Sequence, residues 1–480
     1  MTKINNKGII SIDFLYWWDF VKKENKTTTN KAGFSSKLGF VLAAVGSAVG
    51  LGNIWRFPYL AAQYGGGIFL LVYILLAVTF GFSLCLSEIA IGRRTGKSVL
   101  SAYKDVHPKF GGLGLLAAVV PVIILPYYCV IGGWVIKYFT VFVSGEKAAL
   151  ATAEAGKDAY GAYFDSFISS TGPSILFFMI FLLLTGVIVI MGVEKGIEKV
   201  SKLLMPLLVL LTIGISVYAL TIDGAMDGVK YYLTPDFSKF SFKTVVAAMG
   251  QLFYSMSIAM GILITYGSYM RKEDNIEEAV RYVEIFDTGI AFLAGLMIIP
   301  AVFAFSGGDE SALGYGPGLM FVTLPKVFDY MVGGRVVGIV FFLLVTLAAL
   351  TSSIALLETV VSMLMEKFRI KRIPACIIAI AVSVVMGLLS IFGYGIFSDF
   401  TIFDKQMLDF FDFISNNVIM PLVALITCIL IGWVVKPKYV EEEVMENSKF
   451  RSKRLYEVMV KFICPVCMLI IFISSLIGYV

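Results

Sequence analysis

Long apolar stretches constrain this chain more than any other feature. A helix must contain about 20 mostly apolar residues to cross a bilayer. Only 15% of the residues are charged and 58% are hydrophobic, whereas soluble domains are roughly 25% charged. The sequence therefore predicts an all-α polytopic membrane protein with eleven transmembrane helices. The eleven stretches lie near 37–62, 67–92, 113–142, 174–192, 200–221, 244–269, 283–306, 336–365, 373–394, 408–435 and 457–479.

The distribution of lysine and arginine predicts the orientation. If residues 1–37 are cytosolic, the loops on that side hold 28 Lys and Arg residues and the opposite loops hold 8. This asymmetry indicates a cytosolic amino terminus and an external carboxyl terminus in the plasma membrane. Residues 1–30 lack the pattern of a cleaved signal peptide and are expected to form a cytosolic leader. The net charge of +5 then reflects topology and contact with anionic membrane lipid, and no nucleic-acid partner is expected.

Two of the stretches are interrupted by residues that do not suit a plain membrane helix. The first contains "GSAVGLGNIWRFP" (46–58), and the sixth contains "GQLFYSMSIAMGILITYGSY" (250–269). A break inside the bilayer leaves backbone groups without partners, at several kcal/mol each unless a ligand satisfies them. Small-residue helix packing could explain the glycines but not Asn53 or Arg56. Paired broken helices predict a transporter with a site at mid-membrane.

The five-span separation of the two breaks predicts two inverted halves. Repeat one covers about 37–221 and repeat two about 244–435, and the extra helix covers about 457–479. Together they form a single transporter domain over 31–480. Each half contributes five spans, so the halves have opposite orientations in the membrane.

Several polar side chains lie deep in other apolar stretches. "LAALTSSIALLE" (347–358) places Thr351 and Ser352 side by side, and adjacent hydroxyls could bind a hard cation. Each hydroxyl could instead bond a carbonyl of its own helix. Asp287 lies about one turn into the seventh span, where an ionisable residue is a functional candidate or an acid that reaches the interface. Glu88 and Glu358 are expected to make structural polar contacts.

The sequence disfavours an enzyme. The only histidine, His107, lies in a cytosolic loop, so a Ser-His-Asp hydrolase would lack a base within the membrane. Phosphate-binding and metal-hydrolase motifs are also missing from the sequence. The Cys464-Pro-Val-Cys467 run lies in an apolar helix, where packing is the expected role.

The chain resembles a known family over about residues 31–475. The stretches "KLGFVLAAVGSAVGLGNIWRFPYLAAQYGGGIFLLVY", "PYYCVIGGW", "GQLFYSMSIAMG" and "LTSSIALLE" resemble the neurotransmitter:sodium symporter family in its bacterial amino-acid transporter branch. The resemblance implies sodium-coupled import of an amino acid by alternating access, with helices 1 and 6 broken. Eleven spans suit that branch, because several bacterial members lack a twelfth.

The resemblance also implies two sodium sites, a substrate site and two gates. One sodium site would use the carbonyls of Gly46, Val49 and Ala348 and the hydroxyls of Thr351 and Ser352. The other would use the Ala48 carbonyl, Asn53, Ser255, Asp287 and the substrate carboxylate. Substrate contacts would come from Leu51, Gly52, Ile124, Tyr128, Tyr254, Ser257, Met260 and Leu356, with Ser352 also lining the pocket. The gate residues would be Arg56 with Asp412 outside, and Lys31 with Glu366 beside Tyr269 inside.

Two further expectations follow from the resemblance. Animal members bind chloride near the positions of Tyr73, Gln251 and Ser255, and a fixed carboxylate at Asp287 would remove that requirement. Gly196 and Pro206 enclose nine residues, a spacing that marks where the fifth helix of these proteins unwinds. Glycine weakens a helix and proline removes a backbone hydrogen bond, so this role has a physical basis.

The pocket residues favour a large hydrophobic or aromatic amino acid. Met260 is flexible and polarisable and Leu356 is compact, so tyrosine, tryptophan, leucine and methionine all remain possible. A non-transporting amino-acid sensor or a sodium channel on the same fold is the alternative. The preferred amino acid, the ion stoichiometry and the oligomeric state are not predicted.

Overall fold

The computed structural model describes residues 33–145, 159–308 and 316–478. Helices dominate these residues, and the only β-pairing among them is two isolated bridges, Gly66 with Pro235 and Ile402 with Lys405. The predicted all-α fold is therefore confirmed. The predicted leader, residues 1–30, lies outside the described residues.

Nine helical segments of the described chain are long and apolar enough to cross a membrane. Several contain a π-helical turn, which is labelled η here like the 3₁₀ turns. The nine segments are α4–η2–α5 (Gly67–Leu76, Ala77–Gly81, Phe82–Thr95), η3–α7 (Pro108–Phe110, Gly111–Ser144), α10 (Thr171–Ile190), η4–α11 (Val193–Glu198, Lys199–Ala219), α15 (Ile276–Ser306), α17 (Gly334–Phe368), α18 (Arg372–Tyr394), α19–η8–α20–η9 (Met407–Asp412, Phe413–Ile419, Met420–Ile429, Leu430–Val434) and α22–η10–α23 (Lys453–Val458, Met459–Ile463, Cys464–Leu476).

Two further pairs of helices are interrupted. The pair α2 (Lys37–Ala48) and η1–α3 (Gly52–Arg56, Phe57–Gln63) qualifies as one span bent by 54°. The pair α13 (Phe242–Ser255) and α14 (Ile262–Ser268) is separated by a longer gap. The nine segments and the bent pair give up to ten candidate spans, so the predicted number of eleven stays a prediction. The connecting helices are α6 (Val99–Val106), α9 (Ala159–Ser169), α12 (Ala225–Leu233), η5 (Phe237–Lys239), η7 (Leu319–Thr323), α16 (Leu324–Tyr330) and α21 (Lys438–Met445).

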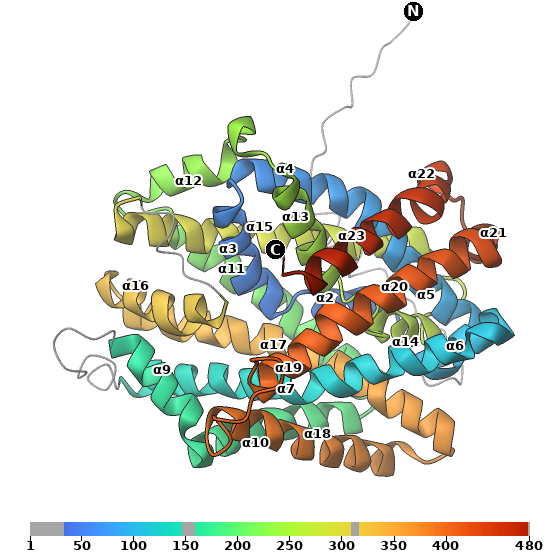
Figure 1. Cartoon of the computed structure of the whole chain (residues 1–480), viewed down its shortest axis with the longest axis horizontal. Helices are drawn as coiled ribbons and strands as arrows, with labels where there is room; N and C mark the ends of the chain where they lie inside the picture. The colour runs from blue at the N-terminus through green and yellow to red at the C-terminus, as the bar shows by residue number, and fades with distance from the viewer. Residues whose placement is uncertain (1–32, 146–158, 309–315, 479–480) are drawn as a thin grey trace, which may run out of the picture.

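The helices around the centre form two packed groups. In one group, α7, α10, α17 and α18 contact one another, and α10 and α18 lie along the lower edge of the view (Figure 1). In the other group, α15 contacts α2, α3 and α5, and α14 also packs on α5. The first span touches both groups, because α2 also contacts α17 and α11. The broken helices therefore belong to the second group, and α2 and α14 contact α17 of the first group.

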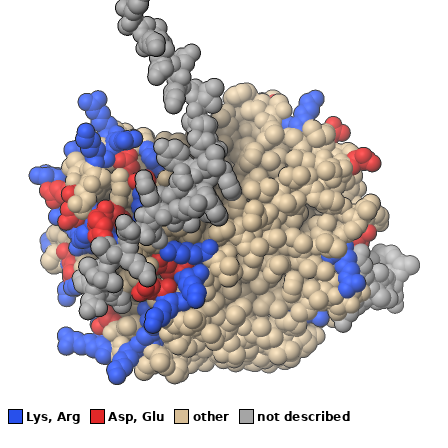
Figure 2. Space-filling view, turned by 180° about the vertical axis from the view of Figure 1, so that it is seen from behind, with Lys and Arg blue, Asp and Glu red and all other residues tan. Residues whose placement is uncertain are grey.

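The surface separates charged ends from an uncharged band. Figure 2 shows Lys, Arg, Asp and Glu gathered mainly at one end of the molecule, a few at the other end, and a broad band without them between. Large apolar side chains are exposed on this protein, for example Leu203 at 70% and Val385 at 62%. Such exposure suits a lipid environment and would be costly in water. The molecule is a multi-pass membrane protein.

Candidate functional site

The first span breaks where its glycines cluster. α2 ends at Ala48, the helix resumes at Gly52, and the two halves are bent by 54°. Gly50 lies between them, and a Cβ there would come within 2.8 Å of the Ser352 Oγ and 3.0 Å of the Tyr128 hydroxyl. A side chain at this position would therefore push the break away from α7 and α17. The predicted break in the first helix is confirmed.

The second break depends on an unusual backbone path. α13 ends at Ser255 and α14 begins at Ile262. Between them, Ser257, Ala259 and Gly261 have positive φ angles of 55°, 62° and 74°. The left-handed region costs a residue other than glycine roughly 1–2 kcal/mol, so neighbouring contacts must hold this segment. The predicted interruption of the sixth helix is confirmed.

Polar contacts tie the two breaks together and support the second. The Ser257 hydroxyl donates to the Ser47 carbonyl in the last turn of α2, at 2.9 Å. The Ala259 N–H donates to Glu88 Oε1 on α5, at 2.8 Å. Both contacts are buried, so they satisfy backbone groups that would otherwise be left without partners. Glu88 therefore makes a polar contact, as predicted, and that contact supports the broken segment.

Four polar residues meet beside the first break. The Asn53 amide Nδ2 donates to Asp287 Oδ1 at 2.7 Å and lies 3.0 Å from the Ser255 Oγ. The Ser255 hydroxyl donates to the same Asp287 oxygen at 2.6 Å, and the Tyr73 hydroxyl donates to Asp287 Oδ2 at 3.3 Å. Asp287 is fully buried, with no exposed surface. The cluster is a buried carboxylate beside two hydroxyl groups and the Asn53 amide, and oxygen atoms of these types are ligands that suit a small hard cation. Ala48 lines the adjoining cavity.

A second oxygen-rich set lies where α2 meets α17. The Ser352 Oγ is 3.3 Å from the Gly46 carbonyl oxygen and 3.2 Å from that of Ala348. The Thr351 hydroxyl donates to the Ala348 carbonyl at 3.0 Å, which is the within-helix bond that the sequence left open as an alternative. A Cβ on Gly46 would lie 3.1 Å from the Thr351 Cβ, so the two backbones approach closely. Val49 is buried at the end of α2.

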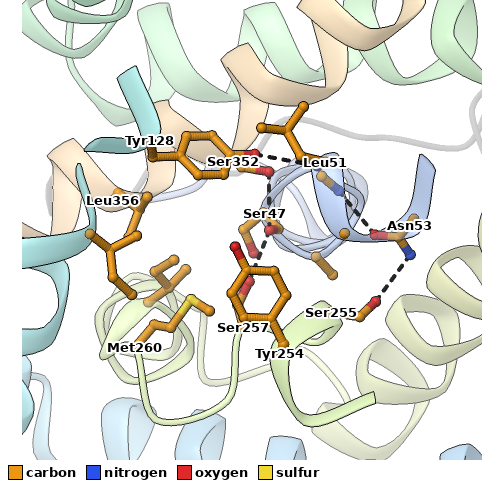
Figure 3. A pocket seen from close by; sticks show the side chains of 15 residues that line it. Ser47, Leu51, Asn53, Tyr128, Tyr254, Ser255, Ser257, Met260, Ser352 and Leu356 are labelled. Atoms are coloured by element: carbon orange, nitrogen blue, oxygen red, sulfur yellow. Dashed lines mark hydrogen bonds between the residues drawn. The ribbon is translucent and has the colours of Figure 1, made fainter. Parts of the chain in front are cut away.

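A small cavity lies between the breaks (Figure 3). All eight residues expected to contact substrate line it, and so does Ser352. Sequence reasoning missed Ile262 and Ser47, which have no distinctive local signal. The lining residues are Ser47, Ala48, Gly50, Leu51, Gly52, Asn53, Ile124, Tyr128, Tyr254, Ser255, Ser257, Met260, Ile262, Ser352 and Leu356.

The cavity has a polar end and an apolar end. The Leu51 N–H donates to the Tyr128 hydroxyl at 3.4 Å, at the amino end of the helix formed by η1 and α3. Helix amino ends attract anionic groups such as carboxylates. Figure 3 shows Met260 and Leu356 together on one side of the cavity, away from Asn53. The arrangement can accept a small molecule with one charged head and one apolar tail.

The residues predicted for the outer gate lie near one another without pairing directly. The Arg56 guanidinium carbon lies 5.4 Å from the centre of the Tyr254 ring, a cation–π distance. Asp412 Oδ1 accepts from the Asn416 amide at 2.6 Å. Within the described residues, no ion pair of 4.0 Å or less joins Arg56 and Asp412. Tyr254 lines the cavity, so Arg56 lies beside a side chain of the cavity wall.

The inner side contains polar contacts at two glutamates, Glu358 and Glu366. The Tyr269 hydroxyl donates to Glu358 Oε1 at 2.8 Å, and Glu358 forms a 2.6 Å ion pair with Arg372. Glu366 Oε2 accepts from the backbone N–H of Ser98, the residue before α6, at 2.7 Å. Lys31, its predicted partner, lies outside the described residues. Sequence reasoning expected a polar contact at Glu358 but missed Arg372, because nothing local indicates that an arginine at the start of α18 reaches back to α17.

Two broken membrane helices, oxygen-rich clusters and a cavity between them define a class of protein, the broken-helix secondary transporters. In the described chain, no group of three or more His, Cys, Asp or Glu side chains is arranged to hold a metal ion. The breaks are the candidate cation sites, because main-chain carbonyls and side-chain oxygens meet there.

Sequence comparison identifies the family. The profile of the sodium:neurotransmitter symporter family matches residues 31–153 and 162–480. An uncharacterized sodium-dependent transporter from Haemophilus influenzae is 35% identical over 463 residues, covering 94% of this chain and 100% of that protein. The human sodium-dependent neutral amino acid transporter SLC6A17 is 26% identical, covering 95% of this chain and 74% of that protein. The chain belongs to the sodium:neurotransmitter symporter family and is a sodium-dependent transporter.

A solved structure supports the same assignment. The crystal structure of MhsT in complex with L-phenylalanine superposes with a TM-score of 0.82 at 37% sequence identity, covering 93% of this chain and 100% of that chain. The similarity confirms both the predicted family and the transporter fold.

Proposed function

We propose that this protein is a chloride-independent symporter that imports a large hydrophobic or aromatic amino acid with sodium. The observation that carries the proposal is the cavity between two broken helices, whose lining includes residues of both oxygen-rich clusters. The apolar side chains of Ile124, Met260 and Leu356 suit a large apolar side chain on the substrate. The bound phenylalanine in MhsT supports the same class of substrate.

The two clusters would bind two sodium ions. The set of Gly46, Val49, Ala348, Thr351 and Ser352 would bind one ion between α2 and α17. The set of Ala48, Asn53, Ser255 and Asp287 would bind the other, and the substrate carboxylate would complete it. Sharing a ligand with the substrate would couple the two binding events, since each would stabilise the site for the other.

Chloride independence follows in this proposal from the fully buried carboxylate of Asp287. The Tyr73 hydroxyl and the Ser255 hydroxyl already donate to this carboxylate, so the donors that could hold a chloride ion are used by a fixed negative charge. A buried cation needs one compensating negative charge, and Asp287 provides it without an exchangeable anion.

Alternating access would use the gate residues at the two ends of the cavity. Outside, Tyr254 would cover the substrate, and Arg56 and Asp412 would approach each other further. Inside, Tyr269, Glu366 and Lys31 would close the path from the cytosol, which is the side expected to hold the amino terminus. The two inverted repeats, about 37–221 and 244–435, would provide the two related conformations.

A sensor or a sodium channel on the same fold is the competing function. A channel would pass sodium without an amino acid, and a sensor would bind the amino acid without accumulating it. The relatives whose names state a substrate are transporters, and this favours transport over sensing or channel activity. The oxygen clusters and the cavity are also adjacent, as coupling requires.

Uptake into proteoliposomes tests the proposal. We would measure accumulation of each of the twenty radiolabelled amino acids with sodium or choline outside, and with chloride or gluconate as the anion. The proposal expects sodium-driven accumulation of a large hydrophobic or aromatic amino acid that is unchanged by gluconate. Equal accumulation in choline, or sodium flux without any amino acid, would refute it.

A further inference from the structure

Asn416, in the π-helical turn η8, binds the carboxylate that is proposed for the outer gate. Its amide Nδ2 donates to Asp412 Oδ1 at 2.6 Å and to the Tyr127 hydroxyl oxygen at 3.1 Å. Tyr127 belongs to α7, which packs against α19 and η8 (Figure 1). Both N–H groups of the amide are therefore used, one within the segment α19–η8 and one toward α7.

These two bonds leave the other end of the Asn416 carboxamide without a partner. The Oδ1 atom is buried and accepts no hydrogen bond within the described part of the chain. Exchanging the amide oxygen and nitrogen would not improve the contacts, because the oxygen would then face the Asp412 carboxylate. A buried acceptor without a donor destabilises the conformation that contains it. A donor that reached this oxygen in another conformation would therefore favour that conformation.

Arg56 is a side chain with unused donors. A guanidinium carries five N–H groups, and that of Arg56 donates a hydrogen bond to no residue that the structure describes, although it lies 5.4 Å from the centre of the Tyr254 ring. In the proposed cycle, Arg56 approaches Asp412 when the outer gate closes. Because the Asn416 amide is bonded to Asp412, a guanidinium that pairs with this carboxylate also comes close to Asn416.

We propose that Asn416 is a positioning residue of the outer gate: its nitrogen orients Asp412, and its oxygen accepts a hydrogen bond from Arg56 when the gate closes. The bond to Asp412 lies within one helical segment and can persist in both conformations, so it does not shift the balance between them. The bond from Arg56 exists only in the closed conformation, and an equilibrium shifts only through such a difference. Asn416 therefore favours closure. The inference rests on the proposed function, which assigns Arg56 and Asp412 to the gate.

Distances between spin labels on the outer side measure gate closure without a transport assay. We would place the labels at Gln63→Cys, the last residue of α3, and at Thr401→Cys, before α19, since both positions are exposed. The full-length protein without these two substitutions is the labelling control, because five of its own cysteines are buried and Cys467 is partly buried. Pulsed electron paramagnetic resonance in lipid nanodiscs then gives the ratio of closed to open molecules in sodium, with and without a mixture of the twenty amino acids.

A double-mutant cycle isolates the proposed contact between Asn416 and Arg56. Asn416→Leu keeps nearly the same size and should lower the closed-to-open ratio about tenfold, the factor expected from losing a hydrogen bond to a charged group. Arg56→Met should lower the ratio as well. In the Arg56→Met background, Asn416→Leu should cause no further fall, because the donor to the Asn416 oxygen is already missing.

The neighbouring Asn417 provides a matched control. Its side chain makes no hydrogen bond with another described residue, and it belongs to the same π-helical turn. Asn417→Leu should therefore leave the closed-to-open ratio unchanged. A similar fall in Asn416→Leu and Asn417→Leu would overturn the inference, since the effect would then come from a disturbed turn.

The other outcomes are equally decisive. An equal fall on Asn416→Leu with and without Arg56 would overturn the inference, because the two side chains would then act independently. A rise of the ratio in Asn416→Leu would overturn it too, since Asn416 would then keep Asp412 away from Arg56. So would a wild type without any closed molecules. The proposed function is decided separately, because a protein whose gate closes but which shows no sodium-driven uptake would refute transport and leave the role of Asn416 standing.

Discussion

Replacing Asp287 with asparagine tests the proposed cation site most directly. Asparagine has nearly the same shape, so the Asn53 and Ser255 groups that donate to Oδ1 at 2.7 and 2.6 Å keep an acceptor oxygen. The Tyr73 hydroxyl, 3.3 Å from Oδ2, would face an amide nitrogen instead. The substitution therefore removes one buried negative charge with little change in packing.

The magnitude follows from the burial of this carboxylate. Charges about 4 Å apart interact by about 4 kcal/mol at an effective dielectric constant of ~20. Asp287 has no exposed surface, so solvent does not screen this attraction appreciably. The remaining amide oxygen recovers part of it as a neutral ligand. We therefore expect a loss of about 1.4–2.8 kcal/mol, which corresponds to a 10- to 100-fold higher half-saturating sodium concentration.

Sodium titrations of amino-acid uptake in proteoliposomes measure this loss. Each titration is run in chloride and in gluconate, because an anion could replace the missing charge beside Tyr73 and Ser255. We expect Asp287→Asn to take up more amino acid in chloride than in gluconate, and wild type to be indifferent. Asp399→Asn, at an exposed acid, is the matched control. Unchanged sodium dependence in Asp287→Asn would refute Asp287 as a cation ligand.

Three further predictions concern other helices. Thr351→Val keeps the shape of the side chain but removes the hydroxyl 3.0 Å from the Ala348 carbonyl; sodium-driven uptake should fall at least about tenfold, and a normal sodium titration would contradict the assignment. Glu88→Ala leaves the buried Ala259 N–H without an acceptor, so uptake should fall and hydrogen exchange over 255–262 should rise. Glu88→Gln should retain more uptake and show a smaller rise in exchange. Arg372→Met leaves Glu358 buried without its 2.6 Å partner, at a cost of about 3–5 kcal/mol; the melting temperature should fall, and adding Glu358→Gln should restore most of it.

The helix breaks could be predicted because their causes are local. Glycines within an apolar stretch, followed at once by Asn53 and Arg56, are improbable in a plain membrane helix whatever surrounds them. The same holds for the serines and glycine that interrupt the sixth span. The left-handed backbone of Ser257 and Ala259 could not be predicted, because it depends on contacts with α2 and α5 that are distant in sequence.

The residues that hold the breaks were harder to recognise than the residues within them. Glu88 and Arg372 are examples. Glu88 accepts from the Ala259 N–H, which is 171 residues away, and Arg372 pairs with Glu358 on a different span. No sequence pattern identifies such pairs. The resemblance predicted Arg56 and Asp412 as a gate pair. The sequence could not predict that they lie apart in this structure, because their separation depends on the packing of helices that are distant in sequence.

The positions of the two oxygen-rich sets indicate that ions bound there would have different functions. Asn53, Ser255 and Asp287 belong to η1, α13 and α15, which lie on one side of the molecule and would stay together if the two helix groups moved apart. Gly46 and Ser352 belong to α2 and α17, on opposite sides of the boundary between the groups. An ion at the first set would therefore stabilise substrate binding in either conformation. An ion at the second set would hold the two helix groups together, and its departure would release α2. Release of α2 is the change that delivery of substrate to the inner side requires.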